Sequence, residues 1–190
     1  MRTIKIALSI KKIVVIGPES TGKSSLCKAL ADHYKTIWVK EFAREYLEKN
    51  GPQYTFENLY EIAAGQIKGE DIAIEKIKNV HEKCIETPLF IDTDLHVIKI
   101  WSEFVFNKCD NRILTQITKR DCDLYLLCDI DLPWIKDTLR EYPDYKTREK
   151  LFHYYKEEMV AQKTLWKVIR GNYEERIADA IKYSDEILSF

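Results

Sequence analysis

The stretch Gly17-Pro18-Glu19-Ser20-Thr21-Gly22-Lys23-Ser24 decides the fold of this 190-residue chain. It matches the pattern G-x-x-x-x-G-K-[ST] at every fixed position, and the apolar run Ile13-Val14-Val15-Ile16 comes directly before it. A β-branched run of this kind predicts a strand that is buried on both faces. Apolar residues at helical spacing follow from about Lys23, so the sequence predicts a strand, a phosphate-binding loop and a helix in that order.

The residue types in this loop suit a nucleoside triphosphate. Gly17 and Gly22 let backbone N–H groups turn inward as an anion nest, and the N-terminus of the following helix adds partial positive charge. Lys23 is expected to bridge the β- and γ-phosphates of ATP, and the Ser24 hydroxyl to coordinate Mg²⁺. The full set of residues expected beside the nucleotide in this loop is Gly17, Glu19, Ser20, Thr21, Gly22, Lys23, Ser24 and Ser25.

Four more short apolar runs predict strands, at residues 36–39, 89–91, 124–128 and 165–169. Helical spacing fills the segments between them, including one or two helices over residues 56–85, and a last helix follows Gly171. Strands that alternate with helices predict a parallel sheet covered on both faces, here a three-layer α/β/α fold of the P-loop NTPase class. The length predicts a single domain over residues 1–190, with residues 1–10 as an N-terminal extension.

Asp92 comes directly after the third predicted strand. Ligands bind at the carboxyl ends of the strands in such sheets, so this carboxylate is expected to support Mg²⁺ beside Ser24, in the manner of a Walker B acid. Aspartate is also a favoured N-cap residue, so a plain helix cap is the alternative for Asp92. The aromatic residues Trp101, Phe104 and Phe106 have helical spacing and are expected in the core.

Composition excludes several classes of function. Thirty basic residues oppose thirty-one acidic ones for a net charge of −1, without the long basic run that nucleic-acid binding needs. The five cysteines and four histidines form no pair at metal-ligand spacing, which indicates reduced thiols and no structural zinc. No stretch reaches 18 apolar residues, so we expect a soluble cytoplasmic protein with neither a membrane nor a nucleic-acid partner.

A polar segment with two prolines and two arginines follows the fourth predicted strand. We call residues 129–148, which include Arg140 and Arg148, the lid segment. Phosphoryl transfer needs cations around the migrating group and a site closed to water, and a mobile arginine-bearing lid supplies both. An ordinary solvated loop is the alternative for this segment.

Motifs beyond the phosphate loop carry a family resemblance. In order, they are Glu41-Phe-Ala-Arg-Glu45, Ile91-Asp-Thr-Asp94, Asp129-Ile-Asp-Leu-Pro-Trp134 and Gly171-Asn-Tyr-Glu-Glu-Arg176. Together with the loop they resemble the NadR-type ribosylnicotinamide kinases over residues 11 to 188. The resemblance implies strand order 2-3-1-4-5 and a nucleoside-kinase-like enzyme that uses ATP and Mg²⁺ to phosphorylate the 5′-hydroxyl of nicotinamide riboside, giving nicotinamide mononucleotide in NAD salvage.

The resemblance also implies roles for individual residues. Glu41 and Arg44 resemble the pair that meets the acceptor nucleoside, with Glu41 as the candidate base. The other residues that the resemblance assigns are Asp92 and Asp94 as the acidic motif near substrate, Arg140 and Arg148 as lid arginines, and Asn172 and Tyr173 as the loop beside adenine. Lys40 stands where some relatives have an aromatic residue that stacks on nicotinamide, so the contact to the acceptor base is not predicted.

Three alternatives stay open at this point. Glu41 and Arg44 have the i, i+3 spacing of a surface ion pair at a helix start. The same machinery would suit a kinase of another nucleoside or nucleotide. A nucleotide-dependent regulatory switch is the alternative of a different class, although Cys128-Asp-Ile-Asp131 replaces the guanine motif that a GTPase needs. The oligomeric state is not predicted.

Overall fold

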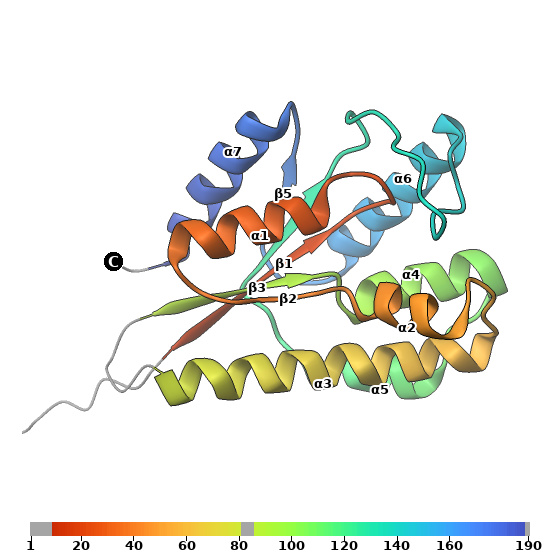
Figure 1. Ribbon diagram of the computed structural model, residues 1–190, viewed down its shortest axis with the longest axis horizontal. Coiled ribbons are helices and arrows are strands. Elements are labelled where there is room, and N and C mark those ends of the chain that lie inside the picture. The colour runs from red at the N-terminus through yellow and green to blue at the C-terminus, as the bar shows by residue number, and fades with distance from the viewer. Residues whose placement is uncertain (1–8, 81–85, 189–190) are drawn as a thin grey trace, which may run out of the picture.

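The computed structural model describes residues 9–80 and 86–188, and within them a five-stranded parallel sheet forms the centre of the molecule (Figure 1). The strands are β1 (Ile10–Ile16), β2 (Trp38–Val39), β3 (Thr87–Asp92), β4 (Leu124–Cys128) and β5 (Trp166–Ile169). Their order is β2-β3-β1-β4-β5, and each neighbouring pair is parallel. The predicted fold class and strand order are therefore confirmed.

Seven helices connect the strands within the part of the chain that the structure describes. They are α1 (Lys23–Tyr34), α2 (Phe42–Asn50), α3 (Phe56–Val80), α4 (Leu95–Phe106), α5 (Asn111–Ile117), α6 (Tyr145–Ala161) and α7 (Tyr173–Asp185). The predicted helical segment 56–85 is one continuous helix up to Val80, and residues 81–85 lie outside the described residues, as do residues 1–8 of the predicted extension.

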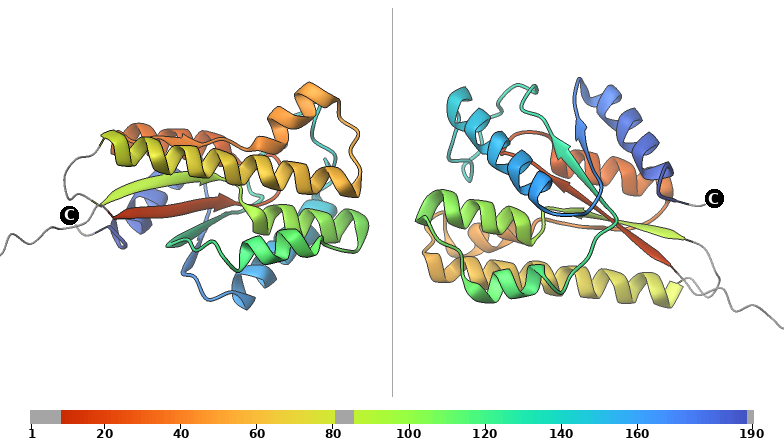
Figure 2. Two further views of the ribbon diagram at one scale, coloured as in Figure 1. Left: turned by 90° about the horizontal axis from the view of Figure 1, so that it is seen from below. Right: turned by 180° about the vertical axis from the view of Figure 1, so that it is seen from behind.

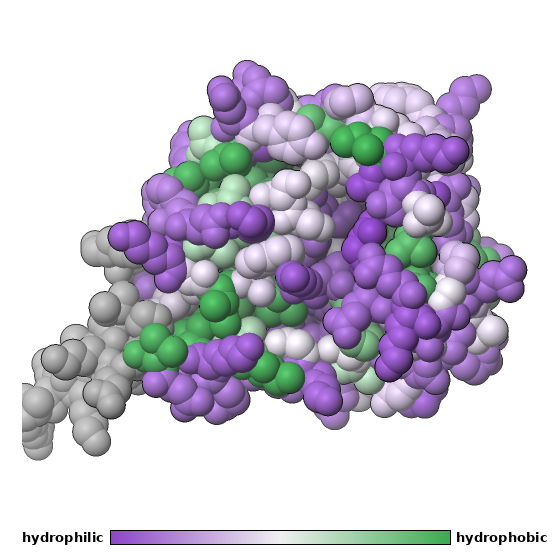
Figure 3. Space-filling model, viewed as in Figure 1, coloured by the Kyte–Doolittle hydropathy of each residue, from purple (hydrophilic) through white to green (hydrophobic). Residues whose placement is uncertain are grey.

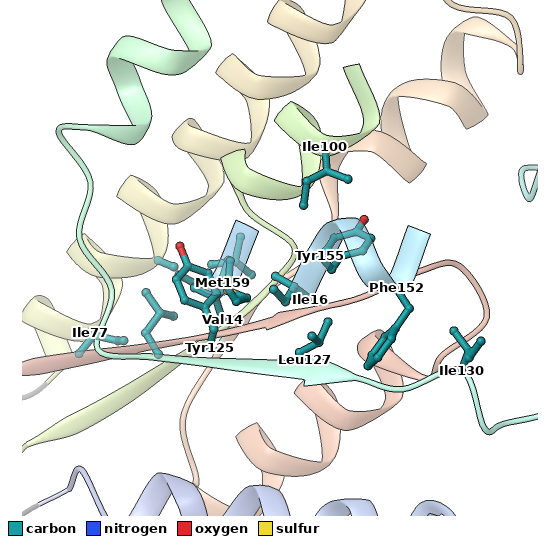
Figure 4. Packing of buried hydrophobic residues seen from close by; sticks show 14 residues of the cluster. Val14, Ile16, Ile77, Ile100, Tyr125, Leu127, Ile130, Phe152, Tyr155 and Met159 are labelled. Carbon is teal, nitrogen blue, oxygen red and sulfur yellow. The ribbon is translucent and has the colours of Figure 1, made fainter. Parts of the chain in front are cut away.

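The two faces of the sheet carry different helices because side chains alternate along each strand. Ile13 and Val15 of β1 pack against α1 and α7, whereas Val14 and Ile16 pack against α3, α4 and α6. Seen from behind, α6 lies in front of the sheet and α1 lies on its far side (Figure 2). Figure 4 shows Tyr155 and Met159 of α6 beside the side chains of β1 and β4. The three-layer architecture leaves the carboxyl ends of the strands open to a site.

A third cluster of apolar residues lies away from the sheet, where α3, α4 and α5 meet. Leu59, Ile62, Leu95, Ile98 and Ile113 are buried there. This cluster packs α3, α4 and α5 together beyond the carboxyl ends of β1 and β3. The packing holds side chains of α3 and α4 in the same cavity as the phosphate loop. No helix among the described residues is long and apolar enough to cross a bilayer.

Candidate active site

The loop between β1 and α1 has the backbone of an anion nest. Ser20 and Gly22 have positive φ angles of 58° and 80°, so consecutive N–H groups turn toward one side of the loop. Gly22 is the N-cap of α1, and no side chain caps this helix. The first N–H groups of α1 are therefore free to donate to an anion, and the helix dipole favours negative charge at the same point.

The loop also packs closely against β4. A Cβ atom on Gly17, whose φ is 139°, would lie 2.6 Å from the carbonyl oxygen of Cys128. The hydroxyl of the buried Thr21 donates to the Pro18 carbonyl at 2.8 Å and closes the turn. The first glycine is thus needed both for its backbone conformation and for the approach of the loop to β4.

Arg176 fixes the loop from the side of α7. This guanidinium is 3% exposed and donates to the carbonyls of Thr21 at 3.0 Å, Gly171 at 2.8 Å and Asp129 at 3.0 Å. It also forms an ion pair with Asp131. One buried side chain therefore connects the phosphate loop, the start of the lid segment and the segment before α7. The sequence motif that contains Arg176 gave no indication of this role.

Lys23, Ser24 and Asp92 meet at the carboxyl end of β3. The Ser24 hydroxyl donates to Asp92 Oδ2 at 2.5 Å, and Lys23 Nζ donates to the Pro18 carbonyl at 3.0 Å. Asp92 is 1% exposed, and its other oxygen, Oδ1, is buried without a hydrogen-bond partner. Burial, and next the negative charge of Glu41, raise the pKa of Asp92 to about 7. Asp92 caps no helix, so the capping alternative does not hold.

This arrangement fits a magnesium ion. A buried carboxylate with an unsatisfied oxygen beside a serine hydroxyl lacks the cation that would stabilise its negative charge. The described residues contain no cluster of three or more histidine, cysteine, aspartate or glutamate side chains placed for a metal. Magnesium bound with phosphates needs only one or two protein ligands, because phosphate oxygens and water complete its octahedron.

Glu41 lies on the other side of the same space, as the N-cap residue of α2. The position of α2 is set by α3: Gln66 is buried, accepts from the Phe42 N–H at 2.9 Å and donates to the Thr93 carbonyl at 2.9 Å. Gly65 gives room to the Phe42 ring, since a Cβ on Gly65 would lie 2.0 Å from the nearest ring atom. Two adjacent residues of α3 therefore place the Glu41 carboxylate.

Arg44 does not pair with Glu41. Its guanidinium donates to Asp137 of the lid segment at 3.0 Å and to Glu48 at 3.4 Å. The alternative of a Glu41–Arg44 surface ion pair is therefore not what the structure has. Arg44 instead connects α2 to the lid segment.

The lid segment lies at the same end of the sheet as the phosphate loop (Figure 1), and hydrogen bonds join the two. Ser20 Oγ accepts from the Ile135 N–H at 3.0 Å and from Arg140 Nη1 at 3.3 Å. Glu19 Oε2 accepts from the backbone N–H groups of Glu141 and Tyr142 at 3.0 and 3.2 Å. Burial raises the pKa of Glu19, against the opposing effect of these two N–H groups. Two side chains at unspecified positions of the phosphate-loop pattern, Glu19 and Ser20, thus hydrogen-bond to the lid segment.

The two lid arginines differ. Arg140 lies on the wall of the central cavity, whereas Arg148 belongs to α6, because that helix begins at Tyr145 within the predicted lid. Arg148 is 4% exposed, its Nε and Nη2 atoms have no hydrogen-bond partner, and its guanidinium lies 5.4 Å from the centroid of the Trp134 ring. The prediction that both arginines sit on one mobile loop is corrected: Arg148 is fixed in a helix.

Two other predicted residues serve the fold. Asp94 caps α4 by accepting from the His96 and Val97 N–H groups, and its second oxygen accepts from the Tyr125 hydroxyl at 2.7 Å. Asn172 caps α7 in a capping box with Glu175. Neither is among the residues that line the central cavity, whereas Tyr173 is. The expected contacts of Asp94 with substrate and of Asn172 with the nucleotide stay predictions.

A cavity of about 270 Å³ joins these parts. It runs from the phosphate loop, with Lys23, Ser24 and Ser25, past Glu41 and Arg44 to a wall of α3, α4 and α6. Figure 3 shows hydrophilic residues gathered on the side of the molecule where the lid segment and α2 lie. Among the cavity-lining residues that sequence reasoning did not assign to the site are Tyr54, Gln66, Trp101, Glu141 and Tyr155.

Comparison with known proteins agrees with this geometry. A family model described as AAA domain matches residues 12–176. Two curated relatives, both named trifunctional NAD biosynthesis/regulator protein NadR, come from Salmonella typhimurium and Escherichia coli. Each is 26% identical over 137 residues, which is 69% of this chain and 31% of the relative. The chain therefore matches about a third of the length of these relatives. The resemblance found in the sequence is confirmed.

Solved structures share the fold. A crystal structure of NadR protein in complex with NR has a TM-score of 0.70 at 20% identity, covering 97% of this chain and 51% of that one. Thymidylate kinase from Ehrlichia chaffeensis has a TM-score of 0.66 at 12% identity and covers 93% of this chain and 99% of its own. Deoxyadenosine kinase from M. mycoides with bound dATP has a TM-score of 0.55 at 11% identity, over 92% of this chain and 99% of its own.

Proposed function

The chain belongs to the AAA-domain family, and we propose that it is an ATP-dependent kinase that phosphorylates the 5′-hydroxyl of nicotinamide riboside. One observation carries the proposal. A single cavity joins an anion-binding loop at one end to a carboxylate and an aromatic wall at the other. The NadR relatives, named for NAD biosynthesis, support a nucleoside of that pathway as the acceptor.

The donor end would bind ATP through backbone N–H groups of the loop and of the first turn of α1. Lys23 would leave the Pro18 carbonyl and place its ammonium between the β- and γ-phosphates. Ser24 and Asp92 would hold Mg²⁺, which supplies charge neutralisation to the phosphates when bound. Ser25 and Tyr173 complete the wall at this end.

Transfer requires one bond to form and one to break. The 5′-hydroxyl oxygen bonds to the γ-phosphorus while the bond from that phosphorus to the β–γ bridging oxygen breaks, so ADP leaves. The hydroxyl proton goes to the Glu41 carboxylate, which faces the same space as Asp92. Arg140 is placed to stabilise the charge on the migrating group from the side of the lid segment.

The ion pairs of Arg44 favour a nucleoside acceptor, which offers a hydroxyl, over a nucleotide acceptor, which carries a phosphate. A nucleotide acceptor would need a free cation for its own phosphate at this end of the cavity. Arg44 is the cavity-lining basic residue that follows Glu41 on α2, and Asp137 and Glu48 already pair with it. A nucleoside kinase therefore fits better than a nucleotide kinase of the thymidylate type.

The test is a screen of nucleosides for stimulated ADP release. Nicotinamide riboside is expected to raise ADP release at least tenfold over the rate with ATP alone, a change of about 1.4 kcal/mol in barrier. Thymidine, deoxyadenosine and thymidine monophosphate serve as comparison acceptors, and Lys23→Ala as the inactive enzyme. Robust ATP hydrolysis that no nucleoside stimulates would contradict the proposal and favour a regulatory switch.

A further inference from the structure

Residues 135–142 of the lid segment, which we call the lid turn, are held by the phosphate loop at both ends. At the first residue of the turn, the backbone N–H donates to Ser20 Oγ at 3.0 Å. At the other end, the backbone N–H groups of Glu141 and Tyr142 donate to Glu19 Oε2 at 3.0 and 3.2 Å. Two neighbouring side chains of the phosphate loop therefore fix the backbone of the lid turn on either side of its arginine.

Arg140 is the arginine of the lid turn, and its direction is fixed while its charge stays available. Its Nη1 atom donates to Ser20 Oγ at 3.3 Å and to the carbonyl of Ile135. The guanidinium also lies 5.8 Å from the centroid of the Trp134 ring. Within residues 9–80 and 86–188, no carboxylate forms an ion pair with Arg140. Its positive charge can therefore act on an anionic group in the cavity that it lines.

The middle of the lid turn is held from the side of α2. Asp137 Oδ2 accepts from Arg44 at 3.0 Å, and Asp137 Oδ1 accepts from the Leu139 N–H at 3.0 Å. The carbonyl of Asp137 accepts from the Arg140 N–H at 3.3 Å. The lid turn is thus held at its two ends by the phosphate loop and in its middle by α2. A side chain on a turn that is held in this way is preorganised, and its position depends on the residues that support it.

The residue types at positions 19 and 20 are not required by phosphate binding itself. The loop pattern leaves both positions unspecified, because backbone N–H groups bind the phosphates. A carboxylate here is unfavourable in two ways, since it repels the phosphates and is itself partly buried. Burial raises the pKa of Glu19, while the two N–H groups of the lid turn and the charge of Lys23 lower it. The gain that offsets these penalties is the pair of charge-assisted hydrogen bonds to the lid turn.

We propose that Glu19 and Ser20 are positioning residues that direct Arg140 toward the migrating phosphoryl group. The loop that binds the donor would then also place the cation that stabilises the transfer. The inference rests on the proposed function, because the action of Arg140 on the phosphoryl group belongs to it. Glu19 and Ser20 act through Arg140, so their loss should lower turnover and leave the binding of ATP nearly unchanged.

The first test separates turnover from donor binding. Glu19→Ala should lower kcat about fivefold while the KM for ATP stays within about twofold, because the arginine is misplaced and the loop backbone is not. Glu19→Gln should restore kcat to within about twofold of the unaltered protein, since the amide oxygen can accept from the same two N–H groups. Glu149→Ala, which removes an exposed carboxylate from α6 outside the cavity, is the control and should leave both values unchanged. A kcat in Glu19→Ala equal to that of the unaltered protein would overturn the inference.

A double-mutant cycle shows whether Glu19 acts through Arg140. In the Arg140→Ala background, the further change Glu19→Ala should lower kcat by less than about twofold, because the group that Glu19 positions is already absent. Ser20→Ala, which removes the acceptor at the other end of the lid turn, should show the same dependence on Arg140. Equal fold-losses for Glu19→Ala with and without Arg140 would mean that Glu19 acts independently, and would overturn the inference.

Limited proteolysis measures the hold on the lid turn without reference to the reaction. Lys136 is exposed within the lid turn, so trypsin cleavage after it reports how often the turn opens. Cleavage at this bond, identified by the masses of the fragments, should be severalfold faster in Glu19→Ala than in Glu19→Gln or the unaltered protein. Equal cleavage in all three proteins would overturn the inference while the kinase activity stands. Absence of phosphorylation of every nucleoside by the unaltered protein would instead overturn the proposed function, and the inference with it.

Discussion

The two ends of the cavity are built in different ways. The proposed donor end is one eight-residue loop whose backbone N–H groups would bind the phosphates, and Arg176 holds that backbone in place. The acceptor end consists of side chains: Glu41 before α2, Tyr54 before α3, Trp101 in α4 and Glu141 in the lid segment. A backbone site tolerates changes in its side chains apart from those that meet the phosphates or metal, here Lys23 and Ser24, whereas a site of converging side chains depends on each residue. The difference predicts where substitutions act.

The sharpest way to separate the two ends is Glu41→Gln. We expect turnover to fall roughly 10²- to 10⁴-fold, because the amide cannot take the hydroxyl proton, while the KM for ATP stays within a few-fold. Steady-state kinetics with each substrate varied in turn measures both values. Glu45→Gln, an exposed residue on the same helix, is the control. An equal loss of ATP affinity would mean that Glu41 acts at the donor end, and the proposed division of the cavity into two ends would be wrong.

Lys23→Ala should weaken the donor end alone. Loss of one preorganised charge between the β- and γ-phosphates costs on the order of 10²–10³ in rate. The midpoint of thermal unfolding should hardly change, since Lys23 makes one hydrogen bond, to a carbonyl of its own loop. Lys28→Ala, on the exposed side of the same helix, is the matched control. A variant that turned over within threefold of the unaltered protein would show that the loop does not bind the donor as proposed.

The lid segment contacts both ends of the cavity. Substitutions of Arg140 and Arg148 test which of the two arginines acts on the migrating phosphoryl group. Arg140→Ala should lower turnover about tenfold, because Arg140 lines the cavity and meets the phosphoryl group most closely in the transition state. Arg148→Ala should stay within about threefold, since Arg148 is buried in α6 outside the cavity wall. Single-turnover rates at saturating ATP distinguish the pair. Equal losses would mean that α6 moves with the lid segment.

The contrast between the donor end and the acceptor end also explains how much of the site the sequence predicted. The phosphate loop was predictable because its pattern, strand and helix are neighbours in the chain. In the acidic motif, Asp92 accepts a hydrogen bond from Ser24, whereas Asp94, two residues on, caps α4. Their roles toward magnesium and substrate stay predictions. Trp101 was expected in the core because helical spacing shows that a residue faces inward, and it cannot distinguish a packed interior from the wall of a cavity.

Tyr54 had no local signal, and Glu141 was indicated only as one position of the predicted lid segment. Each lies outside the helices and strands, and their hydrogen bond spans 87 positions of sequence. Only the fold brings them together, since the lid segment leaves β4 on one side of the phosphate loop and Tyr54 approaches from α2. Arg176 was quoted within a family motif, yet its role as the residue that holds the loop required the structure.

The smallest effect is expected away from both ends, where α4 meets α6. His96 Nδ1 lies 2.7 Å from Glu158, and although burial opposes it, the hydrogen bond to Glu158 raises the pKa of His96. A raised pKa means that the stabilisation is complete below the unfolded value of about 6.5 and is lost as pH rises through the folded value. The unaltered protein should thus have a higher free energy of unfolding than the His96→Gln variant, by on the order of 1 kcal/mol at pH 6 and by less at pH 9.

Denaturant unfolding at the two pH values measures this difference. The KM values for ATP and for the acceptor should be the same in His96→Gln as in the unaltered protein, because His96 lies outside the cavity between the two ends. A stability difference that grew with pH would contradict the assigned charge on the imidazole.

The contact between Gly65 and Phe42 constrains how sequences with this fold can diverge. No side chain fits at position 65 while a phenyl ring occupies position 42, because the added Cβ would overlap the ring. The two positions are therefore coupled in evolution: a descendant that acquires alanine at 65 must also acquire a smaller residue at 42 or shift α2. Such a shift would move Glu41, because Glu41 directly precedes α2. A substitution at position 65, on the face of α3 that packs against α2, would then change which acceptor hydroxyl the Glu41 carboxylate can reach.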